Sequence, residues 1–188
     1  MTFDEVMVLT RSVSSNAAFE DPECKAYFDL LMSLPPHALV VEVGLQFGRS
    51  SAVALQVVKE RNLRYHGIDP FTQPPEAEVP WLKLAQSTGF AAGFYHAEFK
   101  LSKLMSNEAI IGEPIDLILI DGDHSYQAVT DDCNHFMPRV RRGGYALFHD
   151  FGQTSLPEVY NAVRDYMDGN QHWVAESVVG TLGIWRRA

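Results

Sequence analysis

The feature that most constrains the fold is a glycine turn that follows a short apolar run. The run spans residues 38–43, carries an acid at Glu42, and leads into Gly44 and Gly48 before a helix-like stretch at 50–58. Glycine adopts backbone angles, and permits a close approach, that a Cβ would forbid. A helix that begins after such a turn presents free N–H groups to a ligand. The pattern predicts a buried strand, a tight turn and a helix that together bind a nucleotide-like molecule.

The spacing of these glycines limits which nucleotide could bind. Dinucleotide-binding folds favour G-x-G-x-x-G, in which the middle glycine lets the backbone approach a pyrophosphate. Triphosphate-binding loops carry G-x-x-x-x-G-K-[ST]. The chain has Glu-x-Gly-x-x-x-Gly at 42–48, which matches neither pattern. The motif therefore disfavours an NAD-dependent oxidoreductase and a P-loop protein. An ordinary strand-to-helix turn stays open as the alternative to a ligand site.

Strand-like runs alternate with helical patterns along the rest of the chain. After the first strand and helix, we expect strands at 63–69, 94–97, 114–120 and 145–148, a closing hairpin at 173–179 and 181–185, and helices at 100–107, 126–140 and 157–168. Such alternation predicts an α/β fold with a doubly wound, mostly parallel sheet covered on both faces. Ligands in these sheets bind beyond the carboxyl ends of the strands. Glu42, Asp69, Asp121 and Asp150 each fall at such an end, so we expect them in one site.

Composition narrows the class of protein. The chain has 188 residues, of which 46% are apolar and 21% charged, which suits one globular domain. We expect a helical segment at 1–36 packed on a core domain at 37–188. The net charge of −9 argues against nucleic acid as a partner. No apolar run approaches the ~20 residues of a membrane span, and no signal-peptide pattern opens the chain. We therefore expect no membrane partner. Cys24 and Cys133 lack disulfide or zinc-ligand spacing, and two reduced cysteines suit a cytoplasmic protein.

Two segments carry a resemblance to a known family. The turn at 42–48 resembles motif I of class I S-adenosylmethionine-dependent methyltransferases. The run Asp-Leu-Ile-Leu-Ile-Asp-Gly-Asp-His-Ser-Tyr at 116–126, with Gly-Gly-Tyr-Ala-Leu-Phe-His-Asp at 143–150, is similar to the methyltransferase 24 family, which is related to macrocin- and catechol-type O-methyltransferases. The resemblance covers roughly residue 38 to the C-terminus. It implies a Rossmann-like seven-stranded sheet with an antiparallel last strand, and methyl transfer from S-adenosylmethionine to a small hydroxylated molecule.

The resemblance also implies which residues bind the cofactor. Asp69 would accept hydrogen bonds from the ribose hydroxyls, and Phe71 would lie near the adenine. Residues 96–99 stand where the family has an adenine-binding signature, but they do not match it clearly. The full set of expected cofactor contacts is Glu42, Gly44, Gln46, Gly48, Ser50, Ser51, Asp69, Phe71, Asp121, Gly122 and His124.

Two routes of catalysis are open. In the first, Asp121 and Asp150 hold Mg²⁺ or another divalent metal, which lowers the pKa of the acceptor hydroxyl. The related enzymes follow the second carboxylate with Asn or Asp, where this chain has Phe151. His149 could substitute, but strand alternation predicts that its side chain points away from Asp150. In the second route His124 or His149, beside the acid Asp121, is the general base.

Three neighbouring acids and one loop have less specific predictions. Asp123 is expected to brace the turn, and Asp131 and Asp132 to lie on a solvated helix face. The proline-rich stretch at 70–80 is either a lid over the ligand or a surface connector.

Other functions compete with methyl transfer. A nucleotide-binding module of the same fold without transferase activity is the main alternative. Adenine- or cytosine-modifying relatives usually carry Asn/Asp-Pro-Pro-aromatic after the fourth strand, where this chain has Asp-Gly-Asp-His at 121–124. The expected partner is a small-molecule methyl acceptor, which the sequence does not identify, and self-association as a homodimer stays open.

Overall fold

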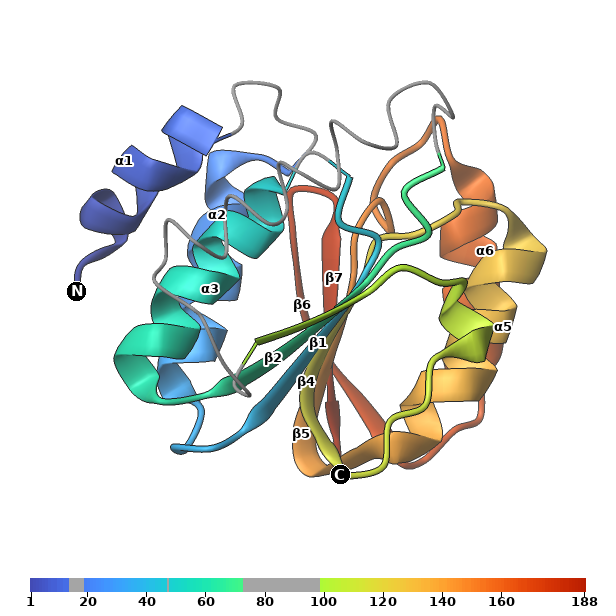
Figure 1. Cartoon of the computed structure of the whole chain (residues 1–188). Helices are drawn as coiled ribbons and strands as arrows, with labels where there is room; N and C mark the ends of the chain where they lie inside the picture. Colours follow the sequence, from blue (N-terminus) through green and yellow to red (C-terminus); the bar gives the residue numbers. More distant parts are fainter. Residues whose placement is uncertain (14–18, 47, 73–98) are drawn as a thin grey trace.

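One seven-stranded sheet forms the centre of the protein (Figure 1). The structure is a computed structural model that describes residues 1–13, 19–46, 48–72 and 99–188. The strand order is β3-β2-β1-β4-β5-β7-β6. The strands are β1 (Leu39–Val43), β2 (Arg64–Ile68), β3 (Phe99–Ser102), β4 (Ile115–Ile120), β5 (Val140–Phe148), β6 (Trp173–Val179) and β7 (Leu182–Arg187). β7 pairs antiparallel with both β5 and β6, and the other described pairs are parallel. The predicted mostly parallel sheet with an antiparallel last strand is confirmed.

Helices cover both faces of this sheet (Figure 1). One face carries α1 (Phe3–Val13), α2 (Asp21–Ser33) and α3 (Arg49–Arg61), and the other carries α5 (Tyr126–Phe136) and α6 (Pro157–Met167). Of two short 3₁₀ helices, η2 (Ser106–Glu108) lies between β3 and β4, and η3 (Met137–Arg139) follows α5 directly.

The central strands β1 and β4 are buried on both faces. Side chains alternate across a strand, so Val40 and Leu117 pack in the core beneath α2 and α3, whereas Val41 and Ile118 pack in the core beneath α5. This double burial explains why both strands are continuous apolar runs. Because β1 and β4 pair in parallel, their carboxyl ends reach the same edge of the sheet, where the residues that follow them meet.

The segment before β1 packs tightly on the first core. Val6, Tyr27 and Leu31, from α1 and α2, are at most 1% exposed. Glu20 and Glu23 form a capping box at the start of α2, with Pro22 in its first turn. This box satisfies N–H groups that the helix leaves unpaired. It also fixes the position of the Glu23 carboxylate in the first turn of α2.

Two sequence-based predictions were wrong. Residues 100–107 do not form a helix, because Phe99–Ser102 pairs with the edge of β2 as β3 and satisfies its backbone groups there. The helix expected at 126–140 is shorter than predicted. α5 ends at Phe136, ahead of Pro138, and residues 140–148 form β5. Arg141 pairs there with the buried Asp116 of β4. The expected strand at 94–97 and most of the loop at 70–80 lie outside the described residues.

Candidate active site

A cavity lies above the carboxyl ends of β1, β2 and β4. Its wall combines the glycine turn, the segment after β2, the segment after β4 and one face of α5. The residues that line it are Val43, Gly44, Gln46, Ile68, Asp69, Pro70, Thr72, Met105, Ser106, Asp121, Gly122, Asp123, His124, Ala128, Asp132 and Asp150. Of the expected strand-end acids, Asp69, Asp121 and Asp150 therefore share one cavity. We call the part lined by Gly44, Gln46 and Asp69 the turn end. The charged end is the part lined by Asp121, His124 and Asp150, together with the buried His149 that contacts the two acids.

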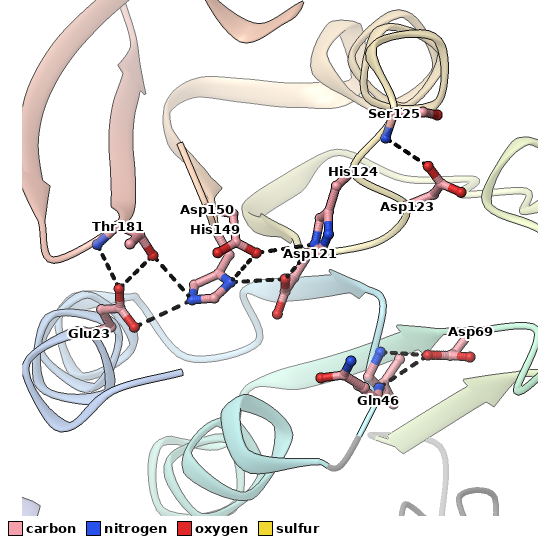
Figure 2. A network of polar contacts seen from close by, with 11 residues as sticks. Glu23, Gln46, Asp69, Asp121, Asp123, His124, Ser125, His149, Asp150 and Thr181 are labelled. Atoms are coloured by element: carbon pink, nitrogen blue, oxygen red, sulfur yellow. Dashed lines mark hydrogen bonds and ion pairs between the residues drawn. The ribbon is translucent and has the colours of Figure 1, made fainter. Parts of the chain in front are cut away.

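At the turn end, backbone amides hold one carboxylate in place (Figure 2). Asp69 Oδ2 accepts hydrogen bonds from the N–H groups of Leu45 (2.7 Å) and Gln46 (3.2 Å), and Asp69 Oδ1 accepts one from Phe71 (2.6 Å). Each carboxylate oxygen can accept more than one hydrogen bond. Asp69 thus has a fixed orientation and remaining capacity to accept from ribose hydroxyls.

Gly44 joins the two ends of the cavity. Its φ of +82° lies in the left-handed region, which side chains disfavour. A Cβ at this position would overlap the backbone carbonyl of Asp121 and approach Gly122. Only glycine therefore lets the turn after β1 pass so close to the segment after β4.

Several expected cofactor residues lie beneath the turn instead of in the cavity wall. Glu42 is fully buried, and its carboxylate accepts hydrogen bonds from the hydroxyls of Ser50 (2.5 Å), Ser51 (2.9 Å) and Tyr65 (2.7 Å). Burial raises the pKa of Glu42 to about 7, although these hydroxyls oppose the shift. The structure gives Glu42 the role of connecting β1, β2 and the start of α3.

Two further residues of the expected cofactor set lie away from the described cavity wall. Gly48 is the N-cap of α3, with a φ of +74°. Phe71 is fully buried and packs with Leu45 and Leu101. Its ring packs against the turn through Leu45, and its expected contact with adenine stays a prediction.

At the charged end, two histidines and two carboxylates form one cluster (Figure 2). His149 Nδ1 lies 3.0 Å from Asp121 Oδ1 and 3.1 Å from Asp150 Oδ2. His124 Nε2 lies 3.1 Å from Asp150 Oδ2 and 3.9 Å from Asp121 Oδ1. Ligand atoms of Asp121, His124 and Asp150 all lie within 4.8 Å of one another, which is compact enough to hold a metal ion.

The expectation that His149 points away from Asp150 was wrong. β5 ends at Phe148, so strand alternation no longer applies to the two residues that follow it. Asp150 has a φ of +58°, which turns its carboxylate back towards the His149 ring. This left-handed residue brings two consecutive side chains to one centre, and periodicity alone does not reveal it.

The charges in this cluster shift the pKa values of its members. The carboxylates of Asp121 and Asp150 outweigh burial and raise the pKa of His124 to about 9. Burial opposes the charged form of His149, but hydrogen bonds to Asp121, Asp150 and Glu23 raise its pKa to about 12. Burial likewise disfavours the Asp150 carboxylate, yet the two histidines hold its pKa well below its usual range. Without a bound cation, both histidines therefore carry the positive charge that these acids require.

Sequence reasoning missed three residues of this region. Glu23 and Thr181 are distant in the chain but contact His149 directly. Asp132, expected on a solvated helix face, is instead 4% exposed and lines the cavity. It lies one helical turn after Ala128, which also lines the cavity, so both are on the same face of α5. Asp123 braces the turn as expected, because its Oδ1 accepts the Ser125 N–H at 2.7 Å.

The sequence matches a known family and known relatives. A family described as "Methyltransferase domain" matches residues 41–151. A chain from Acanthamoeba polyphaga mimivirus, named only as uncharacterized, is 28% identical over 74% of this chain and 66% of its own length. Mycinamicin III 3''-O-methyltransferase from Micromonospora griseorubida is 33% identical over 40% of this chain and 29% of its own length. The match thus spans just under two thirds of the first relative and under one third of the second.

Solved structures share the fold at low sequence identity. The O-methyltransferase NovP has a TM-score of 0.72 at 14% identity, covering 93% of this chain and 84% of its own. CalS11, a TDP-rhamnose 3'-O-methyltransferase, has a TM-score of 0.67 at 14% identity, covering 98% of this chain and 92% of its own. An O-methyltransferase from Bacillus cereus in complex with SAH has a TM-score of 0.62 at 15% identity, covering 99% and 90%. Across the described residues, none of the helices is long and apolar enough to cross a membrane.

Proposed function

This chain belongs to the methyltransferase-domain family of the class I S-adenosylmethionine-dependent fold, and from that membership we propose that it transfers a methyl group from S-adenosylmethionine to a hydroxyl oxygen of a small molecule. One observation carries the proposal: a single cavity runs from the Asp69 carboxylate to the cluster of Asp121, His124 and Asp150. A cofactor held at the turn end would present its sulfonium towards the charged end. The named O-methyltransferases among the relatives support oxygen as the acceptor atom.

The turn end supplies what an adenosyl group needs. Asp69 offers an oriented carboxylate whose Oδ1 still has an acceptor site for a ribose hydroxyl. Gly44 and Gln46 line the cavity, and Gly44 has no Cβ that would keep a ligand from the backbone. Neither pyrophosphate-binding glycine pattern is present, so a sulfonium nucleoside fits this turn better than a dinucleotide.

The charged end supplies what a hydroxyl acceptor needs. Methyl transfer requires the acceptor oxygen in line with the sulfonium carbon and a route for its proton. His124 is 38% exposed at its side chain and lines the cavity, so its imidazole can reach a bound hydroxyl. We assign the neutral form of His124 as the base that takes this proton; because Asp121 and Asp150 raise its pKa to about 9, that form becomes populated as the pH rises or when a cation neutralises the two acids. Asp121 and Asp150 orient the ring from the other side.

The same acids fit a divalent metal. Asp121 and Asp150 offer carboxylate oxygens, which suit Mg²⁺ or Mn²⁺, whereas a histidine nitrogen beside them favours a transition metal over Mg²⁺. When bound, such an ion lowers the pKa of a hydroxyl that it contacts. In this chain Asp121 and Asp150 would hold the ion, and His124 would stay beside it to accept the proton.

A calorimetric titration tests the cofactor. We expect S-adenosylhomocysteine to bind with measurable heat and NAD⁺ to give none. Turnover would then be followed as S-adenosylhomocysteine released in the presence of catechols, sugars and nucleotide sugars. EDTA is expected to stop turnover, and excess Mg²⁺ to restore it.

Each failure in these experiments has a distinct meaning. No heat with S-adenosylhomocysteine on folded protein contradicts the proposal as a whole. Binding without turnover on any acceptor favours the alternative, a nucleotide-binding module without transferase activity. Turnover that persists in EDTA rejects the metal and leaves His124 as the sole means of activating the acceptor.

A further inference from the structure

A buried acid outside the matched family region reaches the charged end. Glu23, near the start of α2, is 1% exposed, and the family match begins only at residue 41. Its carboxylate accepts hydrogen bonds from the Glu20 N–H (2.6 Å), the Thr181 N–H (2.7 Å) and the Thr181 hydroxyl (2.8 Å). His149 Nε2 lies 3.4 Å from Glu23 Oε2 (Figure 2). Glu23 therefore connects α2, the β6–β7 turn and the residue that follows β5.

These contacts determine which nitrogen of His149 carries a proton. A carboxylate with this many donors is an acceptor towards Nε2. The Thr181 oxygen also lies 3.4 Å from Nε2, and its hydrogen is already directed to Glu23 Oε1. Nε2 thus faces two acceptors and must be the donor. In the neutral ring the lone pair is then on Nδ1, which faces Asp121 and Asp150 at 3.0 and 3.1 Å.

The ring has little freedom to leave this orientation. The His149 side chain is 1% exposed, and the Phe19 ring packs against it with centroids 5.1 Å apart. A buried carboxylate behind a histidine, with the opposite nitrogen aimed at further carboxylates, is the arrangement that orients metal-binding histidines.

We infer that Glu23 is a positioning residue of the metal site. It fixes His149 with Nδ1 towards the space between Asp121 and Asp150, where His149 becomes a third ligand of the ion. The inference rests on the metal that the proposed function assigns to Asp121 and Asp150. It adds a ligand, and it explains why an acid is buried in an N-terminal helix.

Mn²⁺ binding measured by electron paramagnetic resonance tests the inference without an acceptor. Glu23→Gln keeps the size of the side chain, but its amide can donate to Nε2 and reverse the tautomer. We expect this variant to bind Mn²⁺ about 10–100-fold more weakly than the wild type. Asp21→Asn is the matched control, because Asp21 lies on the same helix and pairs with Arg11 and Arg49 instead of His149. It should keep its Mn²⁺ affinity within about twofold, whatever stability it loses.

A double-mutant cycle separates positioning from a purely structural role. If Glu23 acts through His149, Glu23→Gln should weaken Mn²⁺ binding no further in a His149→Ala background, because coupled residues are not additive. Wild-type protein with Mg²⁺, labelled with ¹⁵N-histidine, gives a readout that needs no Glu23 variant. The His149 ring should carry its proton on Nε2.

The outcomes distinguish this inference from the proposed function. If the wild type binds Mn²⁺ and Glu23→Gln binds equally well, or if the His149 proton lies on Nδ1 with Mg²⁺ present, the inference is overturned and the metal site stands. A wild type that binds no Mn²⁺ overturns both the metal site and the inference. Cofactor binding, measured separately by calorimetry, would still stand.

Discussion

The turn end and the charged end of the cavity hold their polar groups in different ways. At the turn end, three backbone N–H groups fix Asp69, and the residues involved lie within 27 positions of one another, from Leu45 to Phe71. At the charged end, side chains fix other side chains, and the contact of Glu23 with His149 joins residues 126 positions apart. A backbone cradle depends on local geometry, whereas the charged cluster depends on how distant elements pack.

This difference indicates what each end can tolerate. Backbone donors do not change with a neighbouring substitution unless the turn itself moves. In the charged cluster each group stabilises the ionised form of the next, so one lost charge affects several partners. We therefore expect substitutions at the charged end to remove chemistry and spare cofactor binding. Substitutions at the turn end should weaken cofactor binding and spare the metal.

The largest effect is expected for Asp150→Asn. Asp150 contacts both histidines and is one of two carboxylates proposed for the metal. We expect Mn²⁺ affinity to fall at least about 100-fold, while the dissociation constant of S-adenosylhomocysteine changes less than about threefold. Electron paramagnetic resonance measures the Mn²⁺ affinity, and calorimetry on the same preparation measures the dissociation constant of S-adenosylhomocysteine. Asp165→Asn, an exposed acid of α6, is the control. Equal losses at both ends would break the comparison.

Gly44→Ala should damage both ends together, because residue 44 touches the segment after β4. The added Cβ would overlap the Asp121 carbonyl, and the φ of +82° adds strain. We expect the free energy of unfolding to fall by roughly 3 kcal/mol or more, measured from urea denaturation curves. Gly112→Ala is the control, since nothing lies within 4 Å of its Cβ, and it should change stability by less than about 0.5 kcal/mol. Similar curves for the two variants would contradict the packing described.

Glu42→Gln tests the acid beneath the turn through the pH dependence of stability. The folded-state pKa of about 7 lies above the ordinary 4.5, so the folded protein retains a proton that the unfolded chain releases. The stabilisation is complete below about pH 4.5 and is lost as the pH rises through about 7. From pH 5 to pH 8 this costs the wild type on the order of 2–3 kcal/mol.

The Glu42 carboxyl faces the hydroxyls of Ser50, Ser51 and Tyr65 and the charge of Asp121, and it also affects Tyr27. Asp121 is the one other carboxyl group among these neighbours. Because glutamine does not titrate, the variant should lose less stability than the wild type over the same interval. Urea midpoints measured at pH 5, 6.5 and 8 give the comparison. Parallel pH profiles for wild type and variant would show that Glu42 is ionised throughout.

The smallest effect is expected for Asp69→Asn. The amide keeps one acceptor oxygen, but its NH₂ group would face backbone N–H donors and loosen the turn. We expect the affinity for S-adenosylhomocysteine to fall about 10–100-fold, equivalent to roughly 1–3 kcal/mol, with Mn²⁺ affinity unchanged. Calorimetry measures the affinity for S-adenosylhomocysteine. The control is Asp168→Asn, because Asp168 is an exposed acid. A loss of Mn²⁺ binding in Asp69→Asn would show that the two ends are coupled more strongly than their contacts suggest.

Local patterns in the chain were enough to predict the order of the layers and the edge of the sheet where the site forms. Periodicity and glycine spacing predicted β1, β2, β4, α6 and the closing hairpin, because their patterns depend on residues adjacent in the chain. Asp69, Asp121 and Asp150 were predicted at one site for the same reason, since parallel strands end at a common edge.

The assembly of the charged end, by contrast, follows from packing between distant elements. A left-handed residue at Asp150 turns its carboxylate towards His149, and periodicity gives no sign of such a reversal. Glu23 and Thr181 meet His149 from opposite ends of the chain, and Asp132 enters the cavity because α5 packs above β4. Side-chain contacts across such distances follow from packing, which one-dimensional patterns do not encode. The sequence thus placed the site, and the fold selected which side chains meet in it.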